Sequence, residues 1–235
     1  MSTHSHHHHH EEEHFKSSDL VKDIVIGMAD GLTVPFALAA GLSGAVSSNG
    51  LIVTAGIAEI VAGSIAMGLG GYLAGKTEVE HYASELKREY DEVERVPERE
   101  MQEVKDVFAE YGISPKLQDE LAHEISKDKD KWVDFMMKYE LGMEKPDPKR
   151  AGRSAFNIGA SYVVGGIVPL VGYIIAKTPE GGLMISSALT VLFLFVFGYI
   201  KTKLTGNNPL YGALKTVFIG VLAAGAAYGI ARLVS

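Results

Sequence analysis

The sequence predicts an all-α membrane protein with five transmembrane helices and a cytosolic helical metal-binding domain inserted between helices 2 and 3. The first observation is five apolar runs, each close to the ~20 residues that a membrane-spanning helix needs. The second is an uneven charge distribution, because residues 76–150 hold 21 of the 29 acidic and 14 of the 22 basic residues. The third is the absence of cysteine, which excludes disulfides and thiolate metal sites.

These observations divide the chain into four parts. Residues 1–18 carry the run His6–His10 and are expected to be a disordered or tag-like tail without a function of their own. Residues 19–75 are expected to form transmembrane helices 1 and 2, and residues 151–235 helices 3 to 5. Residues 76–150 form the acidic domain.

The first span, Ile24–Val46, contains a carboxylate and a proline inside its apolar run. An ionisable group at that depth is costly, and it normally faces a partner, a water-filled cavity or an ion path. Pro35 has no N–H, so the carbonyl of Gly31 loses its helical donor one residue from Asp30. We interpret Asp30 as part of a cation path; the alternative is a proline-kinked helix in which Asp30 makes a local cap.

The second span, Leu51–Ala74, follows a short turn and again carries a single acid, Glu59. Small residues dominate this span, which is typical of helices that pack closely in a membrane. Met67 is expected at about the same depth as Asp30, so Asp30, Met67 and Glu59 could form a ladder of ligands, although a methionine here is usually packing only. The residues expected on the face of Glu59 that packs in the bundle are Gly63, Ala66 and Gly70.

No break signal separates the second span from the acidic domain, so one helix is expected to continue into water. Pro97 fits the first position of a new helix, and Gly112 fits the residue after its end. Ser114-Pro115 opens a third helical region that stops near Gly142. The charge alternation of Lys127–Lys131 can divide this region in two.

Three further spans follow: Ala155–Ala176, Leu183–Ile200 and Leu210–Leu233. Basic residues near the span ends are concentrated on one side, which the positive-inside rule assigns to the cytosol. The N-terminus and residues 76–150 are therefore expected in the cytosol and the C-terminus in the lumen. The cytosolic side would hold Lys16, Lys22, Lys76, Lys149, Arg150, Arg153, Lys201, Lys203 and Lys215, and the other side Lys177 and Arg232.

Two pairs of glutamates flank Pro97 in the acidic domain: Glu89 with Glu92, and Glu100 with Glu103. Residues three apart share one helix face, so a chain reversal near Pro97 would bring the two pairs together. Converging carboxylates repel one another unless cations lie between them, and such pairs build metal sites in helical bundles. The simpler alternative is a solvated acidic face.

Met136, Met137 and Glu140 lie on the last helix of the acidic domain. Thioether sulfur favours softer metals than carboxylate oxygen does, so a mixed site points to a first-row transition ion. The alternative is a hydrophobic patch with Trp132 and Phe135 that closes a small core; the two interpretations are compatible.

The stretch DIVIGMADGLTVPFALAAGLSG, with Glu59, Met67, the two glutamate pairs and the MMxxE motif, resembles the vacuolar iron transporter family. The resemblance covers residues 15–235. It implies five membrane helices, a homodimer, and exchange of cytosolic Fe²⁺ for lumenal protons. It assigns Asp30, Glu59 and Met67 to the transport path. It assigns the cytosolic metal site to Glu89, Glu92, Glu100, Glu103, Met136, Met137 and Glu140.

The leading hypothesis is therefore a proton-coupled antiporter of the vacuolar membrane that moves Fe²⁺ from cytosol to vacuole and is not an enzyme. Fe²⁺ is its substrate, no prosthetic group is expected, and Zn²⁺, Mn²⁺ or Co²⁺ could also bind the acidic domain. Its partners would be Fe²⁺, H⁺, lipid and a second copy of the chain, with no nucleic acid. The alternatives are a membrane-anchored ferritin-like oxidase, a passive divalent-metal channel and a Mn²⁺ exporter. Ferritin-like sites typically use Glu-x-x-His pairs; Glu78 with His81 and Glu120 with His123 have this spacing, but neither pair includes a glutamate of the two pairs that flank Pro97.

Overall fold

A computed structural model of the chain describes residues 8–234, and in this part of the chain every regular element is a helix. Residues 1–7 of the predicted tail lie outside the described residues, and the first helix begins within the remainder of that tail. The elements are α1 (His8–Ala45), α2 (Asn49–Arg95), α3 (Pro97–Glu110), α4 (Pro115–Ser126), α5 (Lys129–Phe135), the π-helix η1 (Met136–Glu140), α6 (Arg150–Ile175), α7 (Pro179–Leu204) and α8 (Pro209–Val234).

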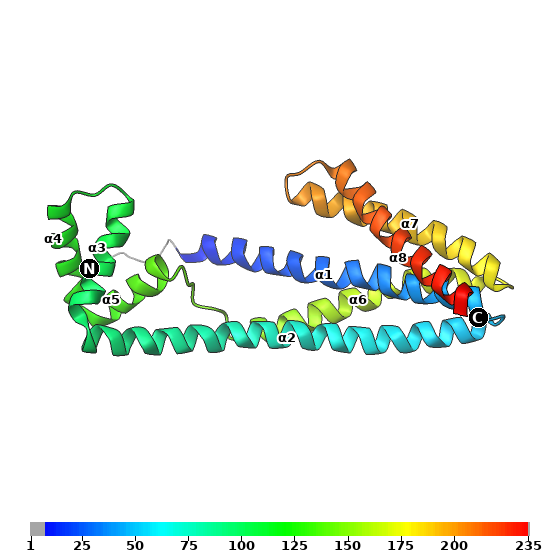
Figure 1. The fold of residues 1–235 in the computed structure, drawn as a ribbon, viewed down its shortest axis with the longest axis horizontal. Coiled ribbons are helices and arrows are strands. Elements are labelled where there is room, and N and C mark those ends of the chain that lie inside the picture. The colour runs from blue at the N-terminus through cyan, green and yellow to red at the C-terminus, as the bar shows by residue number, and fades with distance from the viewer. Residues whose placement is uncertain (1–7, 235) are drawn as a thin grey trace. The chain divides into compact units, whose positions relative to one another are not determined.

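Five of these helices are long and apolar enough to cross a membrane: α1, α2, α6, α7 and α8. This confirms the predicted all-α class and the five spans. α2 runs for 47 residues without interruption (Figure 1), as the missing break signal predicts. The chain divides into two compact units, one formed by residues 1–72 with 151–235 and the other by residues 73–150.

Glycines bring the helices of the first unit into close contact. Gly27 and Gly31 of α1 lie directly against the backbone of α6, at Ile158 and Tyr162, where an added Cβ would collide with a carbonyl. Gly165 of α6 returns the contact: a Cβ there would lie 3.0 Å from the backbone nitrogen of Leu32. α1 and α6 therefore pack backbone to backbone, as small residues allow in membrane helices.

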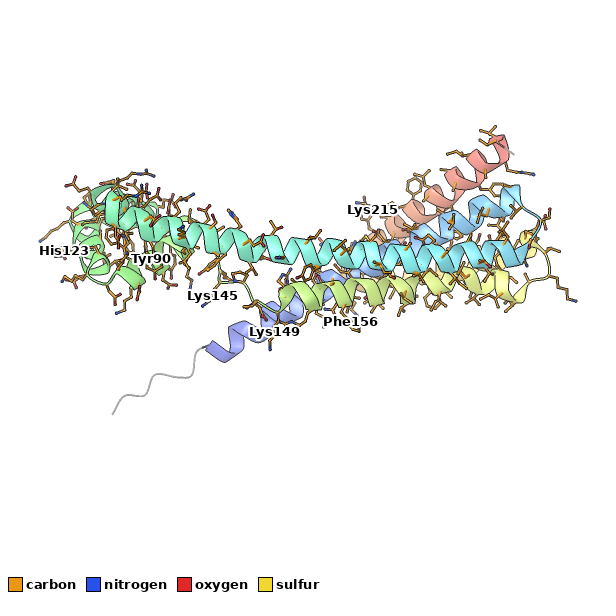
Figure 2. The ribbon with its side chains drawn as sticks, turned by 90° about the horizontal axis from the view of Figure 1, so that it is seen from below. Tyr90, His123, Lys145, Lys149, Phe156 and Lys215 are labelled. Carbon is orange, nitrogen blue, oxygen red and sulfur yellow. The ribbon has the colours of Figure 1, made fainter. Side chains whose placement is uncertain are left out.

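α2 packs along α6, and the two helices lie side by side in Figure 2. The predicted packing face of α2 is right in part. Gly63 contacts Tyr162, but Ala66 and Gly70 are exposed, and an added Cβ at Gly70 would meet no atom within 4 Å. The small residues that complete the contact are Gly56, Gly68 and Gly71, which face α6 from a neighbouring strip of the same helix.

The second unit encloses its own hydrophobic core. The predicted boundaries are correct: Pro97 is at the start of α3, and Gly112 and Gly142 have positive φ angles of 74° and 62° just after helix ends. Asp128 caps α5 by accepting a hydrogen bond from the Lys131 nitrogen at 3.3 Å, which separates α4 from α5. The buried core residues are Val93, Val104, Ala122, Trp132, Val133, Met136 and Met137.

Candidate functional site

The two glutamate pairs meet where α2 reverses into α3. The reversal takes place at Val96, whose φ and ψ of −136° and 48° end one helix before Pro97 begins the next. Glu89, Glu92 and Glu100 each have a ligand oxygen within 4.8 Å of those of the other two. The structure thus brings together three of the four predicted carboxylates; with Glu103 and Glu140 we call them the carboxylate cluster.

Two members of this cluster are fully buried. The exposed fraction of the side chain is 2% for Glu89 and 0% for Glu100. Neither carboxylate oxygen of Glu100, nor Oε2 of Glu89, has a hydrogen-bond partner among the described residues. A buried charge without a partner is strongly unfavourable, so these oxygens require either protons or a bound cation. A merely solvated acidic face does not have this property.

The protonation of the cluster reflects that burial. Burial raises the pKa of Glu89 to about 7, with repulsion from Glu140 and Glu92 adding to it. Burial also raises the pKa of Glu100 to about 7, with repulsion from Glu103 and Glu89 adding to it. Near neutral pH the cluster can therefore hold either protons or a cation at the same oxygens.

Glu103 and Glu140 lie at the more open edge of the cluster. Glu103 accepts a hydrogen bond from Arg99 Nε at 2.9 Å, one helical turn away on α3. Glu140 is exposed, yet partial desolvation of its carboxyl and then repulsion from Glu103 raise its pKa. Glu140 is thus electrostatically coupled to both helices that carry the pairs.

Met136 and Met137 are buried, with exposed fractions of 0% and 1%, and both belong to the hydrophobic core. Trp132 is part of the same core, and Phe135 packs against Phe108 at a ring-centroid distance of 5.3 Å. The interpretation of these residues as a small helical core is therefore correct. Their segment is a π-helix, with the Leu141 nitrogen bonded to the Met136 carbonyl at 3.0 Å, a form that recurs at functional sites.

In the first unit, Asp30 lines a cavity of about 160 Å³. The cavity lies between α1, α7 and α8, which pack against one another. Asp30 is the acidic residue of this lining and Lys201 the basic one, and Thr33 and Thr216 add hydroxyl-bearing side chains. Its other lining residues are Ala29, Thr33, Phe197, Lys201, Thr216 and Ile219.

Glu59 faces the interior of this unit, as its position on α2 predicts. Its Oε1 accepts a hydrogen bond from the hydroxyl of Tyr162 on α6, while its Oε2 is buried and has no partner among the described residues. Met67 is half-buried on the same helix. Within the described chain no hydrogen bond or ion pair joins Asp30 to Glu59, so the ladder of three ligands remains a proposal.

Two residues of this region were missed by sequence reasoning. Tyr162 lies in an uncharged span that also contains Ser161 and Tyr173, so nothing in the sequence marks its hydroxyl. Asp23, with an exposed fraction of 5%, accepts hydrogen bonds from Ser154 Oγ at 2.8 Å and Asn157 Nδ2 at 3.4 Å. The sequence pattern that could have identified Asp23 is its spacing from Asp30, because residues seven apart share one helix face.

Comparison with known proteins identifies relatives of the whole chain. The sequence profile of the VIT family matches residues 21–232. Vacuolar iron transporter 1 of Arabidopsis thaliana is 51% identical over 94% of this chain and 88% of its own length. Vacuolar iron transporter 1 of Eucalyptus grandis is 52% identical over 94% of this chain and 89% of its own length. Protein CCC1 of Saccharomyces cerevisiae is 38% identical over 93% of this chain and 71% of its own length. The two plant relatives carry the names of transporters and not of enzymes. The chain belongs to the VIT family.

Proposed function

We propose that this protein transports Fe²⁺ from the cytosol into the vacuole across the vacuolar membrane. The names of its relatives support iron as the substrate and the vacuole as the destination. The observation that carries a transport mechanism is the pair of acidic side chains, Asp30 and Glu59, inside the first two membrane helices. Asp30 opens on a cavity and Glu59 keeps one oxygen without a partner, as expected of groups that bind a passing ion.

Asp30, Glu59 and Met67 form the transport path in this proposal. A carboxylate binds either a proton or a metal ion, so protons arriving from the lumen displace Fe²⁺ and couple the two movements in opposite directions. Met67 supplies a thioether, a ligand that favours Fe²⁺ over Ca²⁺ and Mg²⁺. The Oε2 of Glu59 supports this proposal because it has no hydrogen-bond partner among the described residues, so a proton or a metal ion would satisfy it.

The carboxylate cluster, with Met136 and Met137, is the cytosolic metal site in this proposal. It collects Fe²⁺, and also accepts Zn²⁺, Mn²⁺ or Co²⁺ because its oxygen and sulfur ligands are not specific to iron. The unpartnered oxygens of Glu89 and Glu100 support it. The described part of the cluster contains carboxylates only, without the histidine of the Glu-x-x-His pairs of ferritin-like oxidases.

We assign the N-terminus and residues 76–150 to the cytosol and the C-terminus to the lumen, from the lysine and arginine asymmetry. A homodimer in the lipid bilayer is the proposed assembly. Protease added to sealed vesicles with the cytosolic face outward should remove residues 76–150 and spare a tag at the C-terminus. Loss of that tag as well would contradict the orientation.

Uptake of Fe²⁺ into proteoliposomes, with and without an imposed pH gradient, tests the transport proposal. Uptake should accelerate when the interior is acidic, and the interior pH should rise as iron enters. Uptake that is indifferent to the gradient would identify a passive channel. Oxygen consumption upon addition of Fe²⁺, with no accumulation inside, would identify an oxidase instead.

A further inference from the structure

Arg88 lies on α2 immediately before Glu89, and its guanidinium group lies at the edge of the carboxylate cluster. Its Nε is 3.4 Å from Glu92 Oε2, and its Nη2 is 3.6 Å from Glu89 Oε1. Both glutamates belong to the proposed metal ligands. A fixed positive charge therefore already lies beside oxygens that a metal ion would use.

The shortest ion pair of Arg88 is to a residue outside the proposed ligands. Its Nη1 is 2.6 Å from Glu85 Oε2, one helical turn earlier on α2. A guanidinium group carries five N–H donors in a rigid fork, so it can contact several carboxylates at once. Arg88 can thus release Glu89 and Glu92 while it keeps its contact with Glu85.

The second glutamate pair has an arginine as well. Arg99 Nε donates to Glu103 Oε1 at 2.9 Å, and the side chain of Arg99 is 64% exposed. Each pair is therefore accompanied by one arginine at its outer edge, while the buried oxygens of Glu100 remain without a partner. The arginines neutralise the accessible side of the cluster and leave its interior open to a ligand of positive charge.

We propose that Arg88 and Arg99 are resident counter-ions of the cluster, which a divalent metal ion must displace, and that they thereby set the metal concentration at which the cluster fills. This inference rests on the proposed role of the cluster as a metal site. A monovalent cation gains little by replacing a guanidinium group of equal charge, whereas a divalent ion interacts twice as strongly with the same carboxylates. The arginines therefore favour divalent over monovalent ions, and Glu85 holds Arg88 after displacement.

The test is calorimetric titration of the purified full-length protein with Zn²⁺, which does not undergo redox reactions. The variant with both Glu100→Ala and Glu103→Ala is the reference, because it reports Zn²⁺ bound elsewhere, including the His6–His10 run. The test variants are Arg88→Gln, Arg99→Gln and Glu85→Gln. Lys87→Gln is the matched control, since it removes the same charge from the neighbouring position and Lys87 forms no ion pair with another described residue.

Arg88→Gln and Arg99→Gln should each tighten Zn²⁺ binding at the cluster by about two- to fivefold at low salt, the scale of a partly exposed ion pair. The gain should shrink at high salt because such pairs are screened. Glu85→Gln should weaken binding, since Arg88 then has no other carboxylate to move to. Lys87→Gln should leave the affinity unchanged.

The inference is overturned if the arginine variants bind Zn²⁺ like the parent, or if Lys87→Gln tightens binding equally. If Arg88→Gln does not fold without metal, Arg88→Lys replaces it: it keeps the charge but loses the fork, and it should lie between parent and Arg88→Gln. The reference variant separates failure of the arginine proposal from failure of the proposed metal site. If the reference variant binds as much Zn²⁺ as the parent, the cluster is not a metal site and the proposed function of this unit fails first.

Discussion

The hydroxyl of Tyr162 on α6 donates a hydrogen bond to Glu59 Oε1 on α2, and the carbonyl of the same tyrosine lies against Gly31, the residue after Asp30. One residue of α6 therefore contacts both helices that carry the acidic side chains of the proposed path. The side chain of Tyr162 orients Glu59, and its backbone packs against Gly31, next to Asp30 in the chain.

Replacing Tyr162 with Phe should slow Fe²⁺ uptake into proteoliposomes by about tenfold, because a hydrogen bond to a charged group is worth ~1.5 kcal/mol or more. Tyr173→Phe is the matched control, since the hydroxyl of Tyr173 donates to the Ala39 carbonyl at 3.2 Å, away from either carboxylate. Equal rates for the two variants would show that Tyr162 only packs.

Asp30→Asn and Glu59→Gln should each abolish proton-driven uptake while the protein remains folded and elutes from a size-exclusion column like the parent. Each change keeps the shape of the side chain and removes its capacity to exchange a proton for a metal ion. Uptake is measured with an acidic vesicle interior. A variant that retains near-normal uptake removes its residue from the mechanism.

Glu100→Ala combined with Glu103→Ala should remove most metal binding by residues 73–150 and lower uptake only in part, because the membrane path is unchanged. Binding should weaken as the pH falls, since metal ligands must be deprotonated. Zn²⁺ titration and uptake assays on the same preparation separate the two effects. Complete loss of uptake would instead make the cluster indispensable to transport.

Without metal, the unit formed by residues 73–150 should lose stability as the pH rises. The pKa of Glu89 and of Glu100 is about 7 in the folded state and 4.5 in the unfolded state. Between these two pH values the folded state binds more protons than the unfolded state, so protonation stabilises the fold. The stabilisation is complete below pH 4.5 and is lost as the pH rises through 7. Above this range a bound metal ion should restore it.

Trp132 is the single tryptophan of the chain and is buried in the core of this unit, so its fluorescence reports the unfolding of the unit. The urea concentration at the unfolding midpoint should decrease as the pH is raised from 5 to 8. It should increase again when Zn²⁺ is added at pH 8. The variant with both Glu89→Gln and Glu100→Gln should show a much flatter pH profile. A parent midpoint that rises with pH would contradict the assignment.

Sequence patterns predicted helix ends and spans well because these depend on local chemistry. Pro97, Gly112 and Gly142 determine helix boundaries through their own backbone preferences, and runs of apolar residues are sufficient to identify membrane helices. The chain reversal at Val96 was also predictable, since a proline disfavours the helical conformation of the residue before it and fits the first position of a new helix.

What could not be predicted depends on contacts between distant residues. The partner of Glu59 is 103 residues away, and nothing in the periodicity of α2 indicates Tyr162. The same holds for Asp23, whose donors Ser154 and Asn157 lie on α6. The packing strip of α2 was partly wrong because helical spacing identifies residues that share a face, but not which face meets a neighbour.

The backbone contact between α1 and α6 restricts the helix movements that are available to the proposed transporter. Helices that touch at Gly27, Gly31 and Gly165 cannot rotate independently without separating, so α1 and α6 are expected to move as one rigid body. The cavity at Asp30 lies instead between α1 and the pair α7 and α8, so for the proposed transport cycle we expect the movement at that boundary. Because the chain has no cysteine, engineered cross-links can test this: one between α1 and α6 should leave turnover intact, and one between α1 and α7 should arrest it.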